Sequence, residues 1–338
     1  MDPINLKKLA EILNVSVSTV SKAFRDSYDI SPETKSRILS LAKELNYQPN
    51  PYASGLRTQK SKTIAVIIPE IANNFFTQAI DGIESIAQEK NYHVLIYFTH
   101  EDYTKEVAFV QHLQHGRVDG VLISLSGDAK DRSHLDLLGH RDIPLVFFDR
   151  VDDHAKTTRV TTNDFESGYM ATQHLVEQGC KKIAHLFFSK DLSIANHRME
   201  GYLQSLHDHR LPVNEKLIVQ CTANHVTNYG LIKNLLKQKH RPDGIFSSFE
   251  KLALLSFEAC EELALNIPRD IKIISFSNIE TAALLNPSLS TITQPAFEMG
   301  KEAASILFNA LENNSVSIAD QKVVLNSTLV KRKSTSRE

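Results

Sequence analysis

Short apolar runs recur between residues 62 and 276, and they restrict the fold more than any other feature of this chain. Seven of them have the length and composition of strands buried on both faces. They are Thr63–Ile68, Val94–Phe98, Gly120–Ser124, Leu145–Phe148, Ile183–Phe188, Gly244–Ser248 and Ile271–Phe276. Segments of helical character separate most of these runs. The alternation predicts an α/β fold built on parallel strands.

The same region contains an internal repeat. Residues 62–65 (KTIA) align with residues 181–184 (KKIA), and at the same offset residues 81–83 (DGI) align with residues 200–202 (EGY). Each copy is a strand followed by a helix that carries an acid–glycine pair. Chance agreement between two strand–helix units is the alternative. A true repeat predicts two α/β lobes with a ligand-binding cleft at the ends of their strands.

Residues 5–46 have a different pattern, that of three short amphipathic helices. Leu6, Leu9, Ala10 and Leu13 recur on one helical face, and Asn5 is placed to cap that helix. A second helix after residues 14–17 turns Val20, Ala23 and Phe24 inward. The third begins at Ser31-Pro32 and buries Ile38, Leu41, Ala42 and Leu45. Two short helices joined by a tight turn and braced by a third form a helix-turn-helix.

The outward face of the second helix suggests a role for this head. Ser16, Ser18, Thr19, Ser21 and Lys22 lie on that face. Short hydroxyl side chains let a helix sit deep in the major groove, and a lysine can reach guanine O6 and N7. The alternative is an ordinary solvated face on a small helical bundle.

Charge is divided unevenly along the chain. Residues 1–60 hold nine lysines and arginines against six acids, a surplus of three, while the whole chain carries −2, so the remaining residues carry −5. A basic head on an acidic body suits a polyanionic partner at one end only. The surplus is small, and by itself it leaves DNA binding open.

Composition favours a cytoplasmic location. No apolar run approaches the roughly 18 residues of a membrane span, and the start lacks the pattern of a secretory signal. Cys180, Cys221 and Cys260 have no CxxC spacing and are expected to be buried, reduced thiols.

Four segments of the head match a known pattern in order and without gaps: residues 9–10 (LA), 15–23 (VSVSTVSKA), 31–34 (SPET) and 46–50 (NYQPN). With these segments the head closely resembles the lactose/galactose repressor family of bacterial transcription regulators. The resemblance implies that Val17, Ser18 and Lys22 read bases. Relatives commonly have arginine where this chain has Lys22, and asparagine where it has Arg25, so the operator sequence is expected to differ.

Residues 49–61 read as a linker of polar residues with little apolar content. In the family the matching segment folds when two subunits meet on DNA, and its leucine, here Leu56, wedges into the minor groove. An ordinary linker with a stray leucine is the alternative. The full set of expected DNA contacts is Ser16, Val17, Ser18, Thr19, Ser21, Lys22, Arg25, Asn50, Ala53, Leu56 and Arg57.

The resemblance continues to about residue 331 and implies a fold like that of periplasmic binding proteins. We therefore expect a helix-turn-helix domain over residues 1–48, a hinge over 49–61 and an effector-binding, dimerising body over 62–338. The N-lobe would span about 62–161 and 291–322, and the C-lobe about 162–290 and 323–331, with the chain crossing between them near 161, 290 and 322.

Arg198 matches the arginine that holds the effector in this family, and a guanidinium can bridge two hydroxyls or a carboxylate. The expected effector contacts are Asn73, Phe75, Asp149, Arg198, Phe249, Glu250 and Asn278. Three pocket positions depart from relatives: Phe249-Glu250 replaces an Asn-Asp pair, Ser277 replaces an acid, and Asn163-Asp164 appears where relatives have Asp-Asn. The effector is expected to be a sugar or sugar derivative of unknown identity.

Catalytic motifs are not found. His112 and His115, or His207 and His209, lack HExxH spacing, and the chain contains no P-loop, no GxGxxG after a strand and no GxSxG elbow. We expect neither metal nor cofactor. Two alternatives are an enzyme with a regulatory head, which would turn over a bound sugar, and a solute-binding protein, which would need a signal peptide and no helix-turn-helix. The favoured hypothesis is a dimeric repressor that binds palindromic operator DNA under effector control.

Overall fold

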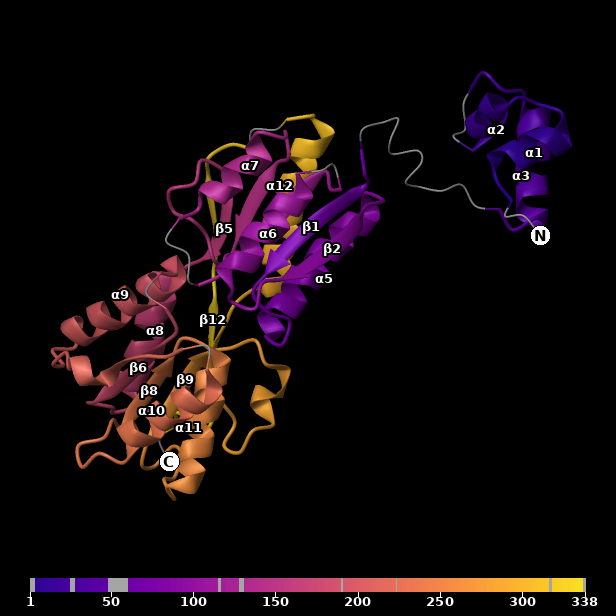
Figure 1. Cartoon of the computed structure of the whole chain (residues 1–338). Coiled ribbons are helices and arrows are strands. Elements are labelled where there is room, and N and C mark those ends of the chain that lie inside the picture. The colour runs from indigo at the N-terminus through magenta and orange to yellow at the C-terminus, as the bar shows by residue number, and fades with distance from the viewer. Residues whose placement is uncertain are drawn as a thin grey trace. The chain divides into compact units, whose positions relative to one another are not determined.

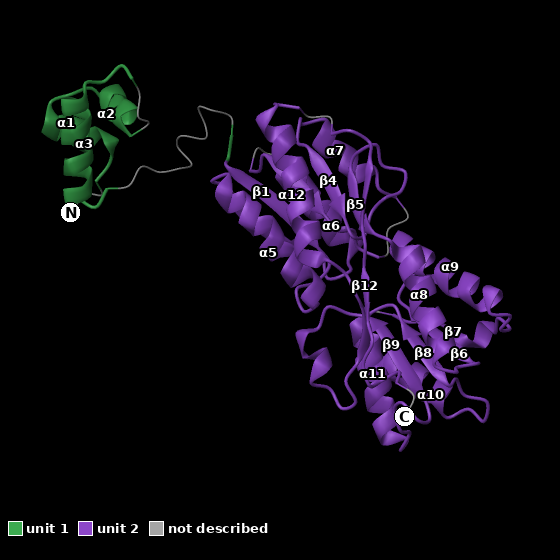
Figure 2. Cartoon of the chain, turned by 180° about the vertical axis from the view of Figure 1, so that it is seen from behind, with its two compact units in different colours: residues 1–61 green, residues 62–338 purple. Residues whose placement is uncertain are grey.

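The computed structural model of the protein describes residues 4–24, 28–47, 60–114, 117–127, 131–189, 191–222, 224–315 and 318–336 (Figure 1). Contacts within the chain divide it into two compact units, residues 1–61 and residues 62–338 (Figure 2). Of the expected hinge, only Lys60 and Ser61 lie within the described ranges.

Unit 1 is the three-helix head that the sequence predicts. Its described helices are α1 (Leu6–Leu13), α2 (Val17–Ala23) and α3 (Pro32–Glu44). The side chains of Asn5, Ser16 and Ser31 each accept a hydrogen bond from a backbone N–H three residues later, which satisfies a free donor at each helix start. The helices enclose a core of Leu9, Ala10, Val20, Ala23, Ile38 and Ala42.

The described residues of unit 2 form two sheets of six strands each. The first has the order β11 (Lys322–Leu325), β5 (Arg159–Thr162), β4 (Leu145–Phe148), β3 (Gly120–Ile123), β1 (Thr63–Ile68), β2 (His93–Phe98). The second has the order β12 (Thr328–Val330), β10 (Ser290–Thr293), β9 (Lys272–Phe276), β8 (Gly244–Ser247), β6 (Ile183–Phe187), β7 (Ile218–Gln220). Neighbouring strands are parallel except for β10 and β12. The predicted α/β class is confirmed.

All seven predicted apolar runs form strands, but five further strands are not among them. β5 and β10 escape prediction because they are rich in threonine and serine, although they lie inside their sheets. β7, β11 and β12 are short, partly exposed strands at the ends of the sheets. Their positions depend on pairing partners that are distant in the sequence.

Helices cover both faces of each sheet. Around the first sheet lie α5 (Asn74–Glu89) and α12 (Ala296–Glu312) on one face, and α6 (Tyr103–Leu113) and α7 (Asp136–Gly139) on the other. Around the second lie α8 (Asp164–Glu177) and α9 (Ser193–Asp208) on one face, and α10 (His225–Leu236) and α11 (Glu250–Glu262) on the other. Short 3-10 turns are η1 (Ser133–Leu135), η2 (Glu215–Leu217) and η3 (Glu280–Ala283). Each sheet with its helices forms one lobe.

The chain passes between the lobes three times, slightly later than the sequence suggests. The passages lie between β5 and α8, between β10 and α12, and between β11 and β12, that is, at residues 162–164, 293–296 and 325–328. The expected N-lobe segment 291–322 is therefore corrected, because residues 291–293 still pair with β9 in the second lobe and residues 323–325 belong to the first.

The repeated acid–glycine pair has the same packing role in both lobes. A Cβ atom on Gly82 in α5 would lie 2.1 Å from the carbonyl oxygen of Phe297 in α12. A Cβ atom on Gly201 in α9 would lie 2.1 Å from the carbonyl oxygen of Phe165 in α8. Backbone atoms cannot give way as side chains do, so each glycine allows two helices to pack closely.

Candidate functional site

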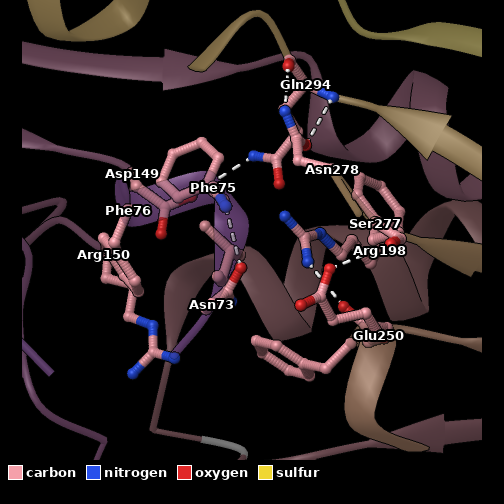
Figure 3. A pocket seen from close by; sticks show the side chains of 14 residues that line it. Asn73, Phe75, Phe76, Asp149, Arg150, Arg198, Glu250, Ser277, Asn278 and Gln294 are labelled. Carbon is pink, nitrogen blue, oxygen red and sulfur yellow. Dashed lines mark hydrogen bonds between the residues drawn. The ribbon is translucent and has the colours of Figure 1, made fainter. Parts of the chain in front are cut away.

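A pocket of about 340 Å³ lies between the lobes, lined by residues that follow the ends of β1, β4, β8, β9 and β10 (Figure 3). Ligands of open α/β sheets bind outside the carboxyl ends of the strands. The lining residues are Asn73, Phe75, Phe76, Asp149, Arg150, Ile194, Arg198, Ser248, Phe249, Glu250, Phe276, Ser277, Asn278 and Gln294. The structure thus brings together all seven residues that the sequence assigned to effector contact.

Arg198 is the most constrained side chain of the pocket, and only 2% of it is exposed. Its Nε donates to Asp164 Oδ1 at 2.7 Å, and its Nη1 donates to the carbonyl oxygen of Ser248 at 2.8 Å. Its guanidinium carbon lies 3.6 Å from the centre of the Phe276 ring. Nη2 is buried without a hydrogen-bond partner among the described residues. A fixed guanidinium with one unused donor is suited to hold an oxygen of a ligand.

Gly168 sets the backbone position of this arginine. A Cβ atom on Gly168 in α8 would lie 2.3 Å from the carbonyl oxygen of Arg198 and 2.9 Å from its Cα. The absence of a side chain therefore lets α8 pack directly against α9 where the arginine begins.

Asp149 follows β4 and is 4% exposed. It has a φ of 60°, a left-handed conformation that is uncommon for a residue other than glycine. Its Oδ1 accepts a hydrogen bond from Gln294 Nε2 at 3.3 Å. Burial raises the pKa of this carboxyl group, although the nearby Arg198 and Arg150 act in the opposite direction. A carboxyl group that holds its proton more readily can donate as well as accept a hydrogen bond.

Glu250 opens α11 and brings a second carboxyl group into the pocket. Ser277 Oγ donates to Glu250 Oε2 at 2.9 Å, and burial raises the pKa of Glu250. Relatives were expected to have an acid at position 277. In this chain the carboxylate beside that position comes from residue 250 instead.

Asn278 links the two lobes. Its Nδ2 donates to Gln78 Oε1 in α5 at 2.8 Å and to the carbonyl oxygen of Gln294 at 2.8 Å. Its Oδ1 accepts from the backbone N–H of Gln294 at 3.2 Å. Asn278 therefore lines the pocket while its amide forms a hydrogen bond to the other lobe, so a change in the angle between the lobes would alter its contacts.

The aromatic residues form the apolar part of the pocket. Asn73 caps α5 by accepting from the backbone N–H of Phe75 at 3.0 Å, which fixes the start of this helix. The rings of Phe75 and Phe76 meet edge to face at 5.2 Å. Phe249 is half-buried, and its ring centre lies 5.7 Å from the guanidinium carbon of Arg198.

Sequence reasoning missed Arg150 and Gln294. Arg150 directly follows Asp149, and its Nη1 donates to both carboxylate oxygens of Glu101 at 2.7 and 2.8 Å. A search of all residues just beyond predicted strands would have found it. Gln294 lies at the end of β10, which is not an apolar run, so no such signal was present.

The outward face of α2 carries the candidate DNA contacts. Ser16, Val17 and Ser18 are exposed, and Thr19, Ser21 and Lys22 are partly exposed. The Ser16 hydroxyl caps the helix and also lies 2.7 Å from the Ser18 hydroxyl. Lys22 Nζ forms an ion pair with Asp29. The other expected DNA contacts lie outside the described residues: Arg25, Asn50, Ala53, Leu56 and Arg57.

Within the described ranges, no group of three or more His, Cys, Asp or Glu residues is arranged to hold a metal ion. No helix in the same ranges is long and apolar enough to span a bilayer. Cys180, Cys221 and Cys260 are buried free thiols, as predicted, and burial raises the pKa of Cys221 and Cys260 to about 12.

Comparison with known proteins gives two family matches. The profile of bacterial regulatory proteins of the lacI family matches residues 5–50, and that of the periplasmic binding protein-like domain matches residues 172–335. Among solved structures, the lac repressor dimer bound to operator and the anti-inducer ONPF has a TM-score of 0.85, with 22% identity and 99% coverage of both chains. This likeness shows a shared fold.

Curated relatives cover almost the whole chain. The PurR transcriptional repressor of Vibrio atlanticus is 29% identical over 91% of this chain and 92% of its own length. The ribose operon repressor of Haemophilus influenzae is 30% identical over 97% of this chain and 98% of its own length. These relatives are repressors, in agreement with the prediction of a DNA-binding regulator and not an enzyme. The chain belongs to the lacI family of bacterial regulatory proteins.

Proposed function

We propose that this transcription regulator is a repressor that acts in the cytoplasm as a homodimer on palindromic operator DNA. A sugar or sugar derivative bound between the lobes would control its affinity for the operator. The observation that carries the proposal is Arg198, whose Nη2 is buried without a hydrogen-bond partner in the described part of the chain, beside a pocket lined by carboxyl, amide and aromatic groups. Ligand oxygens would satisfy this donor, and leaving it unsatisfied is costly.

The pocket suits a polyhydroxylated ring. Asp149 and Glu250 supply carboxyl groups for hydroxyls, while Phe75 and Phe249 supply apolar faces. Two similar solved structures support the sugar class: a LacI family transcriptional regulator from Enterococcus faecium with bound ribose, 26% identical, and a complex of the transcriptional regulator CelR with cellobiose, 22% identical. Because Glu250 provides the acid beside Ser277, sugar selectivity is expected to differ from that of relatives.

On the DNA side, α2 would enter the major groove with Val17, Ser18 and Lys22 toward the base edges. Exposure of Val17 and Ser18 supports this role, and the ion pair with Asp29 would orient Lys22. Ser16, Thr19, Ser21 and the residues beyond the described ranges (Arg25, Asn50, Ala53, Leu56 and Arg57) complete the proposed contact set. Dimerisation would supply the second half-site, since one such head makes few base contacts.

Coupling between the two sites would act through the angle of the lobes. Polar contacts among the described residues join the lobes around the pocket. They include Asn278 with Gln78, Ser189 Oγ with the Gly127 carbonyl at 3.2 Å, Ser193 Oγ with the Val151 carbonyl at 3.3 Å, and the ion pair of Lys251 with Glu70. A ligand that strengthens or breaks such contacts changes the preferred lobe angle. Linkage then requires that sugar and operator change each other's affinity by the same factor.

The test begins with selection of genomic DNA fragments on the purified protein at stated salt, because phosphate contacts make affinity salt-dependent. An enriched palindrome is expected. Its affinity is then measured with and without a panel of sugars. Lys22→Ala should weaken binding to the selected site about tenfold or more. Lys8→Ala, an exposed lysine on α1, is the matched control and should change it little.

The outcomes separate the parts of the proposal. If a palindrome is selected but no sugar changes its affinity, the sugar class is wrong. If no palindrome is selected with or without the sugar panel, the proposed operator contacts are wrong.

A further inference from the structure

A second and larger chamber of about 980 Å³ adjoins the pocket between the lobes. We call it the outer chamber, and its walls include Pro69, Phe188, His225, Asn228, Leu252 and Leu255. These residues come from both lobes, since Pro69 follows β1 of the first sheet and Phe188 follows β6 of the second. The outer chamber is therefore a second part of the same cleft.

Two side chains separate the outer chamber from the pocket. Arg150 and Phe249 line both spaces. The guanidinium carbon of Arg150 lies 5.6 Å from the centre of the Phe249 ring, and Glu101 in the first lobe holds the guanidinium in place. Arg150 and Phe249 come from different lobes, so the division between the two spaces is one cation–π contact across the cleft and not a continuous wall.

Arg150 also has an unused donor at this division. Only 3% of the residue is exposed, and its Nε is buried without a hydrogen-bond partner among the described residues. A buried guanidinium N–H is normally paired. An oxygen that passes between Arg150 and Phe249 would satisfy it.

The two spaces differ in chemistry. Carboxyl and amide groups dominate the pocket, with Arg198 at its centre (Figure 3). The outer chamber combines apolar side chains with charged ones, Glu70, Glu101 and Lys251, and the rings of Phe188 and Phe249 meet there edge to face at 5.9 Å. His225 and Asn228 bring further polar groups to it. Aromatic rings beside polar groups suit a sugar ring, which has apolar C–H faces and a hydroxyl edge.

We propose that the effector is a disaccharide, with one ring in the pocket and the second ring in the outer chamber, joined past Arg150 and Phe249. The proposal rests on the proposed function, namely control by a sugar. The outer chamber is the larger of the two spaces, and it shares Arg150 and Phe249 with the pocket. A single ring would leave the outer chamber to solvent.

The test measures binding of matched sugars to the full-length protein by isothermal titration calorimetry. The probes are glucose with cellobiose and maltose, galactose with lactose, xylose with xylobiose, and ribose. One disaccharide is expected to bind about tenfold or more tightly than its own monosaccharide. Equal or tighter binding by the matching monosaccharide would overturn the disaccharide proposal while leaving sugar control intact. No binding by any probe would overturn the sugar class as well.

A variant at the outer chamber sharpens the test. His225 is exposed at the start of α10 and lines only the outer chamber, so His225→Trp should fill that space without disturbing the core. It should weaken disaccharide binding about tenfold and leave monosaccharide binding within about twofold. His207→Trp is the matched control, since this histidine is exposed on α9 and lines neither space. If His225→Trp leaves disaccharide affinity unchanged, the second ring does not occupy the outer chamber.

Discussion

Replacing Asp164 by asparagine removes the negative charge that faces Arg198 and keeps the shape of the side chain. Both residues are almost fully buried, with 3% and 2% of their side chains exposed, and the atoms Nε and Oδ1 are 2.7 Å apart. Removal of one partner of a buried ion pair costs about 3–5 kcal/mol, because the other charge remains buried. Two contacts of Arg198 persist, the hydrogen bond to the Ser248 carbonyl and the Phe276 ring.

We therefore expect Asp164→Asn to lower the free energy of unfolding by about 3 kcal/mol, at the lower end of this range. For domains of this size, 1 kcal/mol corresponds to about 2–4 °C, so the melting temperature should fall by roughly 6–12 °C. Thermal unfolding followed by far-ultraviolet circular dichroism is the suitable assay, since the chain contains no tryptophan.

A double-mutant cycle with Arg198→Met isolates the pair. If the two effects add to within about 0.5 kcal/mol, the residues are not coupled and the reasoning is refuted. Glu298→Gln is the control, because its 3.8 Å pair with Lys301 is exposed on α12. Its effect should stay below about 1 kcal/mol.

Three further changes test other parts of the structure. Burial lowers the pKa of His185 to about 3. Below about pH 6.5 the unfolded chain therefore binds a proton at this histidine that the folded chain does not bind, and the free energy of unfolding falls by about 2 kcal/mol at about pH 5. Thermal melts of His185→Phe should lose that part of the pH dependence, and parallel profiles would contradict the assignment. Gly168→Ala places a Cβ atom 2.3 Å from a backbone oxygen of α9 and should weaken sugar binding about tenfold, measured by calorimetry. Gly230→Ala is the control and should leave sugar binding unchanged, because a Cβ atom at that position meets no described atom within 4 Å. Asp29→Asn removes the ion pair of Lys22 and should raise the affinity for scrambled DNA about twofold to fivefold, measured by fluorescence anisotropy. If the ratio of operator affinity to scrambled-DNA affinity stays unchanged, Asp29 does not orient Lys22.

Local patterns predicted most of the fold. The helices of the head follow from apolar spacing and from caps such as Asn5 and Ser31, whose hydrogen bonds reach only three residues along the chain. The apolar runs predicted the buried strands for a similar reason, since a strand covered on both faces needs apolar side chains throughout. β5 and β10 were missed because threonine and serine can fill interior strands when neighbouring strands and helices cover them.

The pocket was predicted less completely. Resemblance to a family suggested Asp149 and Arg198, and the structure brings both to one pocket. Gln294 was not predicted, because its strand was not recognised. The outer chamber could not be predicted either, since it exists only where the two lobes meet.

The sequence by itself determined the helix-turn-helix head, the α/β body, the repeated lobe and the types of side chain available on the head and in the pocket. Tertiary structure decided how those side chains are used. Glu250 lies beside Ser277 and supplies the carboxyl group that relatives were expected to have at position 277. The side-chain amide of Asn278 forms a hydrogen bond between the lobes. The physical reason is that the burial of a side chain and its hydrogen-bond partners determine its pKa and the hydrogen bonds it can still form with a ligand. Burial and partners both depend on residues that are far apart in the sequence.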